Sequence, residues 1–445
     1  MTAPVAYDLP IEAASDRVSR LWALVAMACM VLAFVGLRIG TGVLQSPEQW
    51  DEQYITIPMF ELMEQGWSVE TAIDFEETKG PALIWPYALL GETLGGSLND
   101  LRLVSGLFFV LSVVPLLLLA TRAGSRGASL LLAALGFMLL PYEIVFGQLV
   151  MGEASFLFGA LWLVLIALWG FGDSTHGPHR WAGPVLYCLV LAILLHSRIH
   201  AVAWAGAICL VAFQREGIRS WPWWIASIIA GALRVPLWIR WGGLVSPEYA
   251  NLHGLGFRLE PLVYLGAALV PLTGVFLVVW FLRRRACPFQ SLCPIGACIG
   301  LVLAVVAMPD LSIPETLDLS VMHDRYQGIM ATTVTMLGGT GLLRSVLLGG
   351  ACVVGFASLG AMGALAFGMR SVDGLVSIAR VQFWVFCIGI GLYALTRGFV
   401  FDRFLIVWAV GLPVLWARML PRWLLAAQLI VLLLIAAKMC MTWLG

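Results

Sequence analysis

Long runs of apolar residues decide what this chain can fold into. A transmembrane helix needs about 20 apolar residues, and the strongest runs lie at residues 21–43, 104–121, 127–145 and 149–171. Further apolar runs follow with little interruption toward the C-terminus. Charged residues make up only 12% of the 445 residues, about half of the share in soluble globular proteins. The sequence therefore predicts an all-α polytopic membrane protein, one transmembrane domain with about eleven to fourteen spans.

The charge balance and the cysteine pattern exclude two further classes of protein. Lysine plus arginine equal aspartate plus glutamate, at 26 each, so no positive surface field exists to hold nucleic acid. The closest cysteines, Cys287, Cys293 and Cys298, lack the CxxC pairing or the nearby histidine of a zinc site. We therefore expect no nucleic-acid partner, and we interpret the nine cysteines as packed free thiols.

Arginines recur in alternate short loops, which indicates the sidedness of the spans. The positive-inside rule makes such loops cytoplasmic, and they carry Arg122, Arg126, Arg180, Arg215, Arg219, Arg283, Arg284 and Arg285. The alternate loops then face outward, at residues 44–103, 143–153, 240–260 and 309–328. Beyond Arg344 the arginines fall on both sides, so the orientation of the C-terminal part stays open. The first apolar run is longer than the core of a signal peptide, and we expect it to remain as a signal anchor.

The first outer loop holds an unusual share of the negative charge. Nine of the 26 acidic residues lie between residues 48 and 77. Within this stretch Ile55, Met59 and Leu62 recur at helical spacing, which predicts an interfacial amphipathic helix. Most of the nine carboxylates are read as a solvated acidic face. Asp51 and Glu52 differ, because they stand where the chain leaves the first span, at the mouth of the helix bundle.

Lys79 is an exception among the basic residues. The chain has only two lysines, Lys79 and Lys438, and Lys79 lies on the outward side against the positive-inside trend. Its ammonium group either snorkels to the interface or meets a phosphate at headgroup depth, where lysine acts as a point charge. The following segment, residues 81–96, is apolar but too short to cross a membrane comfortably, so it dips in or lies at the interface.

Several ionisable residues fall at membrane depth, where each is expected to face the bundle interior or water. Glu143 and Glu153 flank an outward turn, and a break between two spans carries His196, Arg198 and His200. The basic cluster binds an anionic headgroup or caps helix ends.

A third outward loop contains His323, Asp324 and Arg325. This loop is either a solvated loop or an acceptor-binding lid.

Four segments resemble the integral-membrane glycosyltransferases of the GT-C type, which use polyprenyl-phosphate sugars as donors. WDEQYITIPMFELMEQGW at the start of the outer loop is similar to protein O-mannosyltransferases and lipid A aminoarabinose transferases. FEETKGPALIWPYALLG resembles the family's Lys-Pro-Pro segment, with Lys79-Gly80-Pro81 in its place. VMGEASFLFGALWLVLIALW carries Glu153 where an aspartate is more usual, and FVFDRFLIVWAVGLP resembles a late Asp-Arg-Tyr stretch. The outer loop also looks somewhat like that of dolichyl-phosphate-glucose glucosyltransferases.

The resemblance implies a GT-C-like bundle with an interfacial loop at residues 44–103, a catalytic module at residues 20–215 and a variable region at residues 216–445. It also implies a multi-pass protein of the bacterial inner (plasma) membrane with its active site on the periplasmic or extracellular side. The donor would be a polyprenyl-phosphate sugar, the acceptor a glycan, lipid or protein, and the reaction an inverting transfer.

The resemblance and the chemistry together suggest roles for the candidate residues. Because the leaving group is a phosphate, one carboxylate base and cations on the phosphate suffice. Asp51 would be the base, and Glu52 or Glu153 would orient the acceptor or a divalent ion such as Mg²⁺ or Mn²⁺. Lys79 and Arg198 would hold the phosphate. The remaining candidates for substrate binding are His196, His200 and Arg325.

Three other functions fit part of the pattern. A transporter or flippase also places ionisable residues in the membrane, but it predicts internal repeats and broken helices at mid-membrane. A polysaccharide polymerase or ligase would more often have its large outer loop late in the chain. The last alternative is a membrane scaffold without catalytic activity.

Overall fold

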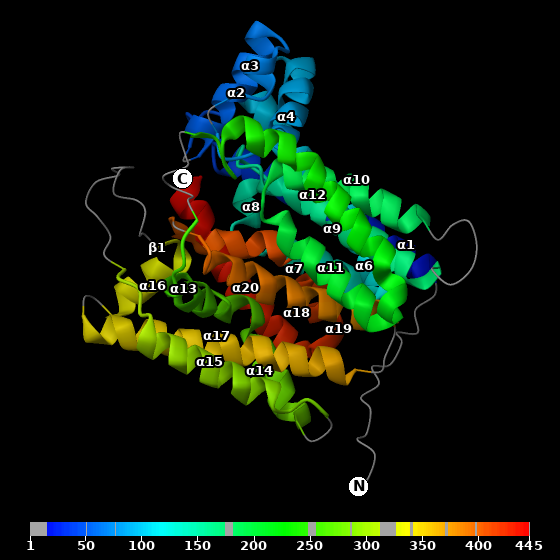
Figure 1. Ribbon diagram of the computed structural model, residues 1–445, viewed down its shortest axis with the longest axis vertical. Helices are drawn as coiled ribbons and strands as arrows, with labels where there is room; N and C mark the ends of the chain where they lie inside the picture. Colours follow the sequence, from blue (N-terminus) through cyan, green and yellow to red (C-terminus); the bar gives the residue numbers. More distant parts are fainter. Residues whose placement is uncertain are drawn as a thin grey trace.

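The computed structural model describes residues 16–49, 51–75, 77–173, 181–247, 255–284, 287–311, 326–338, 341–369, 373–396 and 398–444. These residues are almost entirely helical (Figure 1), which confirms the expected all-α architecture. The elements are α1 (Asp16–Gly40), α2 (Glu52–Gln65), α3 (Val69–Ala72), α4 (Pro81–Leu94), α5 (Leu98–Leu111), α6 (Val113–Arg122), α7 (Ala128–Met138), α8 (Glu143–Phe146), α9 (Glu153–Asp173), α10 (Ala182–Ser197), α11 (Ala201–Glu216), η2 (Gly217–Ser220), α12 (Trp221–Trp241), α13 (Glu260–Ala268), α14 (Val270–Arg283), α15 (Leu292–Val306), β1 (Tyr326–Gln327), α16 (Ile329–Gly338), α17 (Leu342–Gly368), α18 (Asp373–Tyr393), β2 (Val400–Phe401), η6 (Asp402–Trp408), α19 (Leu412–Met419) and α20 (Arg422–Trp443).

Seven helical segments of the described chain are long and apolar enough to cross a membrane, or eight if the bent pair α13 and α14 counts as one span. They confirm a multi-pass membrane protein. The number is smaller than the eleven to fourteen expected from the sequence. One reason is that four apolar helices, α7, α10, α15 and α16, have only 10–17 residues. The seven segments are Val18–Gly40, Leu98–Arg122, Glu153–Phe171, Ala201–Trp241, Leu342–Gly368, Gly374–Tyr393 and Arg422–Thr442.

One of the seven segments, Ala201–Trp241, passes through the bundle twice. At the end of α11, Arg215 Nη1 donates a hydrogen bond of 2.7 Å to Ser377 Oγ at the start of α18. At the end of α12, Arg240 forms an ion pair with Asp74. The hydroxyl of Tyr393, at the far end of α18, lies 2.7 Å from His200 Nε2, just before α11. The chain therefore descends through α11 and returns through α12.

These contacts separate two ends of the bundle. One end holds α2–α4, the turn before α11 and the end of α18, whereas the other holds the ends of α6 and α11 and the start of α18. Arg122 and Arg215 thus lie opposite the acidic segment that contains Asp74, as the alternation of arginines predicted. The C-terminal end of α20 lies near α8, on the side of α2–α4 (Figure 1).

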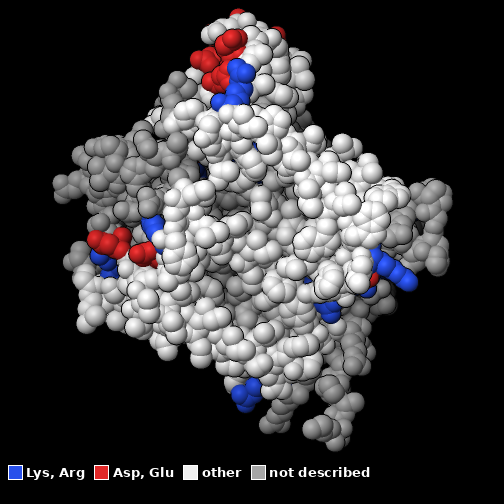
Figure 2. Space-filling model, in the orientation of Figure 1, with Lys and Arg blue, Asp and Glu red and all other residues white. Residues whose placement is uncertain are grey.

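The charged side chains that are visible on one face of the molecule lie mostly near its edges (Figure 2). In the face shown in Figure 2 they gather over α2 and α3 at the top, beside α16 at the left and along the right and lower edges, and the broad surface between is uncharged. Large apolar side chains are exposed on this bundle, such as Leu32 at 70% and Val305 at 77%. Such a surface is what a lipid bilayer covers.

Residues 51–94 fold into a small helical unit with its own core. The helix predicted around residues 55–62 is present as α2, and Ile55, Met59 and Leu62 are buried as the pattern indicated. They pack against Leu83 and Ile84 of α4. The short apolar segment after Lys79 is thus α4, a helix that packs on α2.

Glycines allow α13, α15 and α17 to pack in very close contact. A side-chain carbon at Gly355 of α17 would lie 1.8 Å from the carbonyl oxygen of Gly266 in α13. One at Gly296 of α15 would lie 2.2 Å from the carbonyl oxygen of Phe356. Small residues at helix interfaces let backbones approach, which is a main source of helix association in membranes.

The packing predicts the effect of adding one methyl group to α17. Gly355→Ala should destabilise the protein by about 1–3 kcal/mol because a backbone carbonyl cannot move aside easily. Gly350→Ala is the matched control, since a side-chain carbon there meets nothing within 4 Å. Thermal unfolding in detergent measures both variants. Equal unfolding temperatures for the two would show that the α13–α17 contact is not as close as described.

Candidate functional site

Asp51 is the centre of a cluster built from distant parts of the chain. Its Oδ2 lies 3.4 Å from Lys79 Nζ and forms a second ion pair with Arg403 Nη2. The Asp51 side chain is 31% exposed, whereas those of Lys79 and Arg403 are 7% and 5% exposed. Two buried cations therefore form ion pairs with one partly exposed carboxylate.

The two cations keep Asp51 ionised. Burial alone would raise the pKa of Asp51, but the charges of Arg403, of Lys79 and, more weakly, of Arg198 outweigh it. The net result is a pKa well below the usual range of an aspartate. Asp51 is thus a carboxylate throughout the physiological pH range.

Arg403 reaches Asp51 from a segment that is fixed on its other side. β2, directly before it, pairs in parallel with β1. The adjacent Asp402 accepts hydrogen bonds of 2.6 Å from the Tyr142 hydroxyl and 2.7 Å from the Met330 backbone N–H. Burial raises the pKa of Asp402 to about 6. At neutral pH the carboxylate is ionised and accepts both bonds, which holds the backbone from which Arg403 extends.

Lys79 is held by its neighbours in the turn before α4. Its Nζ also lies 3.1 Å from Glu77 Oε1, and the Glu77 side chain is buried. The next residue, Gly80, donates a backbone hydrogen bond of 2.8 Å to the Ser197 carbonyl. A side-chain carbon on Gly80 would lie 1.8 Å from the His196 carbonyl oxygen. A proline at position 80 would have neither an N–H to donate nor the space for its ring.

Glu153 and Arg198 form a second, buried ion pair near Asp51. Arg198 Nη2 lies 3.0 Å from Glu153 Oε1 and donates a hydrogen bond to the Met151 carbonyl. The two side chains are 1% and 6% exposed. Glu143 is fully buried, and neither of its oxygens has a hydrogen-bond partner among the described residues. Burial and the nearby charge of Glu153 raise the pKa of Glu143 well above the usual range of a glutamate.

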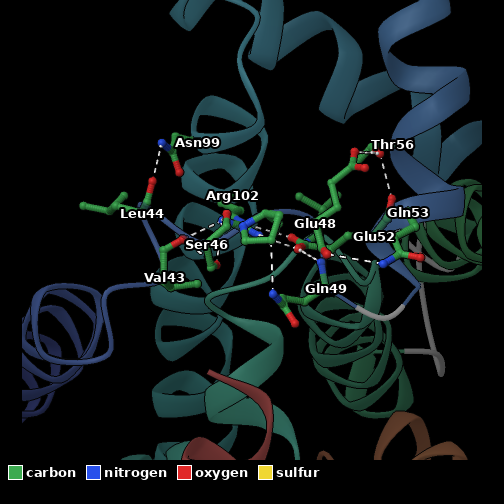
Figure 3. Close-up of polar contacts among 12 residues, drawn as sticks. Val43, Leu44, Ser46, Glu48, Gln49, Glu52, Gln53, Thr56, Asn99 and Arg102 are labelled. Atoms are coloured by element: carbon green, nitrogen blue, oxygen red, sulfur yellow. Dashed lines mark hydrogen bonds and ion pairs between the residues drawn. The ribbon is translucent and has the colours of Figure 1, made fainter. Parts of the chain in front are cut away.

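Glu52 lies directly after Asp51 but has a different environment. Its carboxylate accepts hydrogen bonds from Arg102 Nε at 3.0 Å and Nη2 at 2.6 Å, and from the backbone N–H groups of Val150 and Gln49. Both Glu52 and Arg102 are 0% exposed. Arg102 also donates to the carbonyls of residues 43, 46 and 47 (Figure 3). Glu52 therefore anchors the loop to α5, in place of the acceptor-orienting role that the sequence suggested.

The three remaining candidates for substrate binding are His196, His200 and Arg325. His196 Nδ1 lies 2.8 Å from the carbonyl of Ala192 in its own helix. The His200 ring contacts the rings of Tyr393, Phe404 and Trp408, so it belongs to an aromatic cluster next to Arg403. Arg325, like His323 and Asp324, lies outside the described residues.

The described residues contain no group of three or more His, Cys, Asp or Glu side chains placed to hold a metal ion.

The structure brings together four of the predicted residues, Asp51, Lys79, Glu153 and Arg198, and adds Arg403, which the sequence reasoning did not include. The one signal for Arg403 was its place in the DRF stretch, where two charged residues interrupt an apolar run.

Comparisons of the chain with protein-family models, with curated proteins and with solved structures find no match. An ionised, partly exposed carboxylate can accept a proton from an acceptor hydroxyl, and its basicity increases when a bound anion offsets the charge of the adjacent cations.

The buried pair of Glu52 and Arg102 predicts a large effect on stability. Arg102→Met should cost about 3–5 kcal/mol, because it leaves the Glu52 carboxylate buried without its counterion. Arg240→Met is the control, since it breaks the exposed pair with Asp74 and should change the unfolding free energy far less. Unfolding free energies in mixed detergent would measure both. Similar values for the two variants would contradict the anchoring role of Glu52.

Proposed function

We propose that this protein is a glycosyltransferase that moves a sugar from a polyprenyl-phosphate donor to an acceptor hydroxyl, with Asp51 as the general base. The observation that carries the proposal is the accessible Asp51 carboxylate, held ionised by Lys79 and Arg403 at the end of the helix bundle. The proposal agrees with the resemblance of the surrounding segments to GT-C glycosyltransferases.

The reaction needs few groups from the protein. The acceptor hydroxyl attacks the anomeric carbon, the bond from that carbon to the phosphate oxygen breaks, and Asp51 takes the hydroxyl proton. The phosphate leaves as a stabilised anion, so no general acid is required, unlike glycoside hydrolysis with its two carboxylates. Attack opposite the leaving group inverts the anomeric configuration. Lys79 and Arg198 are the nearby cations that would stabilise charge on the departing phosphate.

The position of the cluster suits a lipid-linked donor. Asp51 is the N-cap of α2, so it lies at the start of the small helical unit, which stands at one end of the uncharged belt of the bundle (Figure 2). A polyprenyl chain can remain in the bilayer along that belt while its phosphate reaches the cations. We propose the periplasmic side of a bacterial inner membrane as the location, with a glycan, lipid or protein as the acceptor.

A transporter is the second candidate, because α13 and α14 are bent by 68° at Leu269. Broken helices in transporters bind substrates or ions at the break. Between Glu260 and Arg283, however, the segment has no charged residue, and the Leu269 side chain is buried. The charged groups gather instead around Asp51, at the end of the bundle, which favours the transferase.

Replacement of the carboxylate tests the proposal. Asp51→Asn should lower sugar transfer by about 10²–10⁴-fold, the usual contribution of a general base. The assay uses reconstituted membranes and a panel of polyprenyl-phosphate hexoses and pentoses, with release of polyprenyl phosphate as the readout. Asp74→Asn, in the same outer segment, is the control and should transfer sugar like the parent. Turnover that survives in Asp51→Asn, at unchanged protein abundance, would remove Asp51 as the base.

A further inference from the structure

Arg234 on α12 is a buried arginine that forms no ion pair with any carboxylate of the described residues. Its side chain is 1% exposed, and its Nε and Nη1 have no hydrogen-bond partner within the described part of the chain. Arg102, Arg198 and Arg403 are buried to a similar degree, but each forms an ion pair with a carboxylate. An unpaired buried charge is strongly unfavourable, so this arginine is a site where an anion would bind favourably.

Two aromatic rings lie beside Arg234, and the His196 carbonyl approaches the same side of Gly80 as its Nη1 does. Its guanidinium carbon lies 5.8 Å from the ring centroid of Trp238 and 6.0 Å from that of Trp241. Aromatic faces support a guanidinium but do not neutralise its charge. The indole Nε1 of Trp238 is also buried and has no acceptor among the described residues. Three donor atoms on adjacent turns of one helix therefore lack an acceptor.

The start of α4 faces the same place. Arg234 Nη1 lies 3.6 Å from the position that a side-chain carbon of Gly80 would take. Gly80 is the N-cap of α4, a helix of 14 residues whose first turn has no side-chain cap. Pro81 has no N–H, and the N–H groups of Leu83 and Ile84 bond to the Gly80 carbonyl, which leaves that of Ala82. A helix N-terminus with a free N–H attracts anions.

We propose that Arg234, Trp238 and the N-terminus of α4 form a binding site for a phosphate group. Arginine binds phosphate through two parallel hydrogen bonds, which the free Nε and a terminal nitrogen can supply. Under the proposed function, on which this identification rests, the phosphate is that of the lipid-linked donor. Lys79 and Arg198, the cations proposed above to act on the departing phosphate, also form ion pairs with carboxylates, whereas Arg234 forms none with the described residues.

The depth of Arg234 fits the phosphate of a lipid. Arg240, six residues later on α12, is exposed and pairs with Asp74 in the outer segment, so Arg234 lies about 9 Å deeper at 1.5 Å per residue. Leu233 and Val235, its neighbours in sequence, are 53% and 40% exposed on the apolar surface of the bundle. Free phosphate has the same chemistry, and the experiment distinguishes the two sources.

Equilibrium binding to the full chain in nanodiscs tests the site. The probes are a polyprenyl monophosphate, the neutral polyprenol and inorganic phosphate. The parent should bind the monophosphate more tightly than the polyprenol, and Arg234→Gln should weaken monophosphate binding by about 10–100-fold, the range for hydrogen bonds to a charged group. Arg240→Gln, which removes the same charge from the same helix, should bind within twofold of the parent. Inorganic phosphate that displaces the lipid at comparable concentration would assign the site to free phosphate.

Unchanged binding in Arg234→Gln, or an equal loss in Arg240→Gln, would overturn the proposal. Arg234→Met controls for folding: without ligand it should unfold at a temperature no lower than the parent, because it removes an unpaired buried charge, yet it should lose the stabilisation that the monophosphate gives the parent. The assay contains neither sugar nor acceptor. A protein that binds phosphate through Arg234 but transfers no sugar would therefore contradict the proposed function alone.

Discussion

The ion pairs of Asp51 with Lys79 and Arg403 join the first loop of the chain to its last third. Asp51 and Arg403 are 352 residues apart in the sequence, and the cluster requires that the start of α2, the start of α4 and the segment after α18 lie side by side. Gly80 against the His196 carbonyl and Asp402 against Tyr142 fix the two backbones involved. A change in either support would move a cation away from Asp51.

Three buried arginines follow one rule, and Glu143 and Arg234 depart from it. Arg102, Arg198 and Arg403 each face a carboxylate, as membrane-embedded charges usually do. Glu143 has no cation within ion-pair distance in the described chain, and its burial raises its pKa. Arg234 forms no ion pair with the described residues, and an arginine stays charged in proteins. In our account a bound phosphate supplies the negative charge beside Arg234.

The sequence predicted which helix face is buried, and at which end of the bundle a loop lies, better than it predicted ion-pair partners. Apolar periodicity located the buried face of α2, and the alternation of arginines separated Arg122 and Arg215 from the acidic loop. Neither pattern contains information on which cation meets which carboxylate across the bundle, so Glu52 was assigned to the substrate although Arg102 encloses it. Arg403 lies outside the catalytic module expected at residues 20–215, because a site between helices draws on whichever segments end beside it. Fewer long apolar helices are present than the expected spans, because four apolar helices have only 10–17 residues and one long segment, Ala201–Trp241, holds two passes.

A double-mutant cycle between Asp51 and Arg403 tests the central contact most directly. Unfolding free energies are measured for the parent, Asp51→Asn, Arg403→Gln and the double variant, with Asp51 and Arg219, an exposed arginine at the opposite end of the bundle, as the reference pair. Our account predicts a coupling of about 1–3 kcal/mol for Asp51 with Arg403 and a value near zero for the reference pair. A coupling for Asp51 with Arg403 that equals the reference value would contradict it.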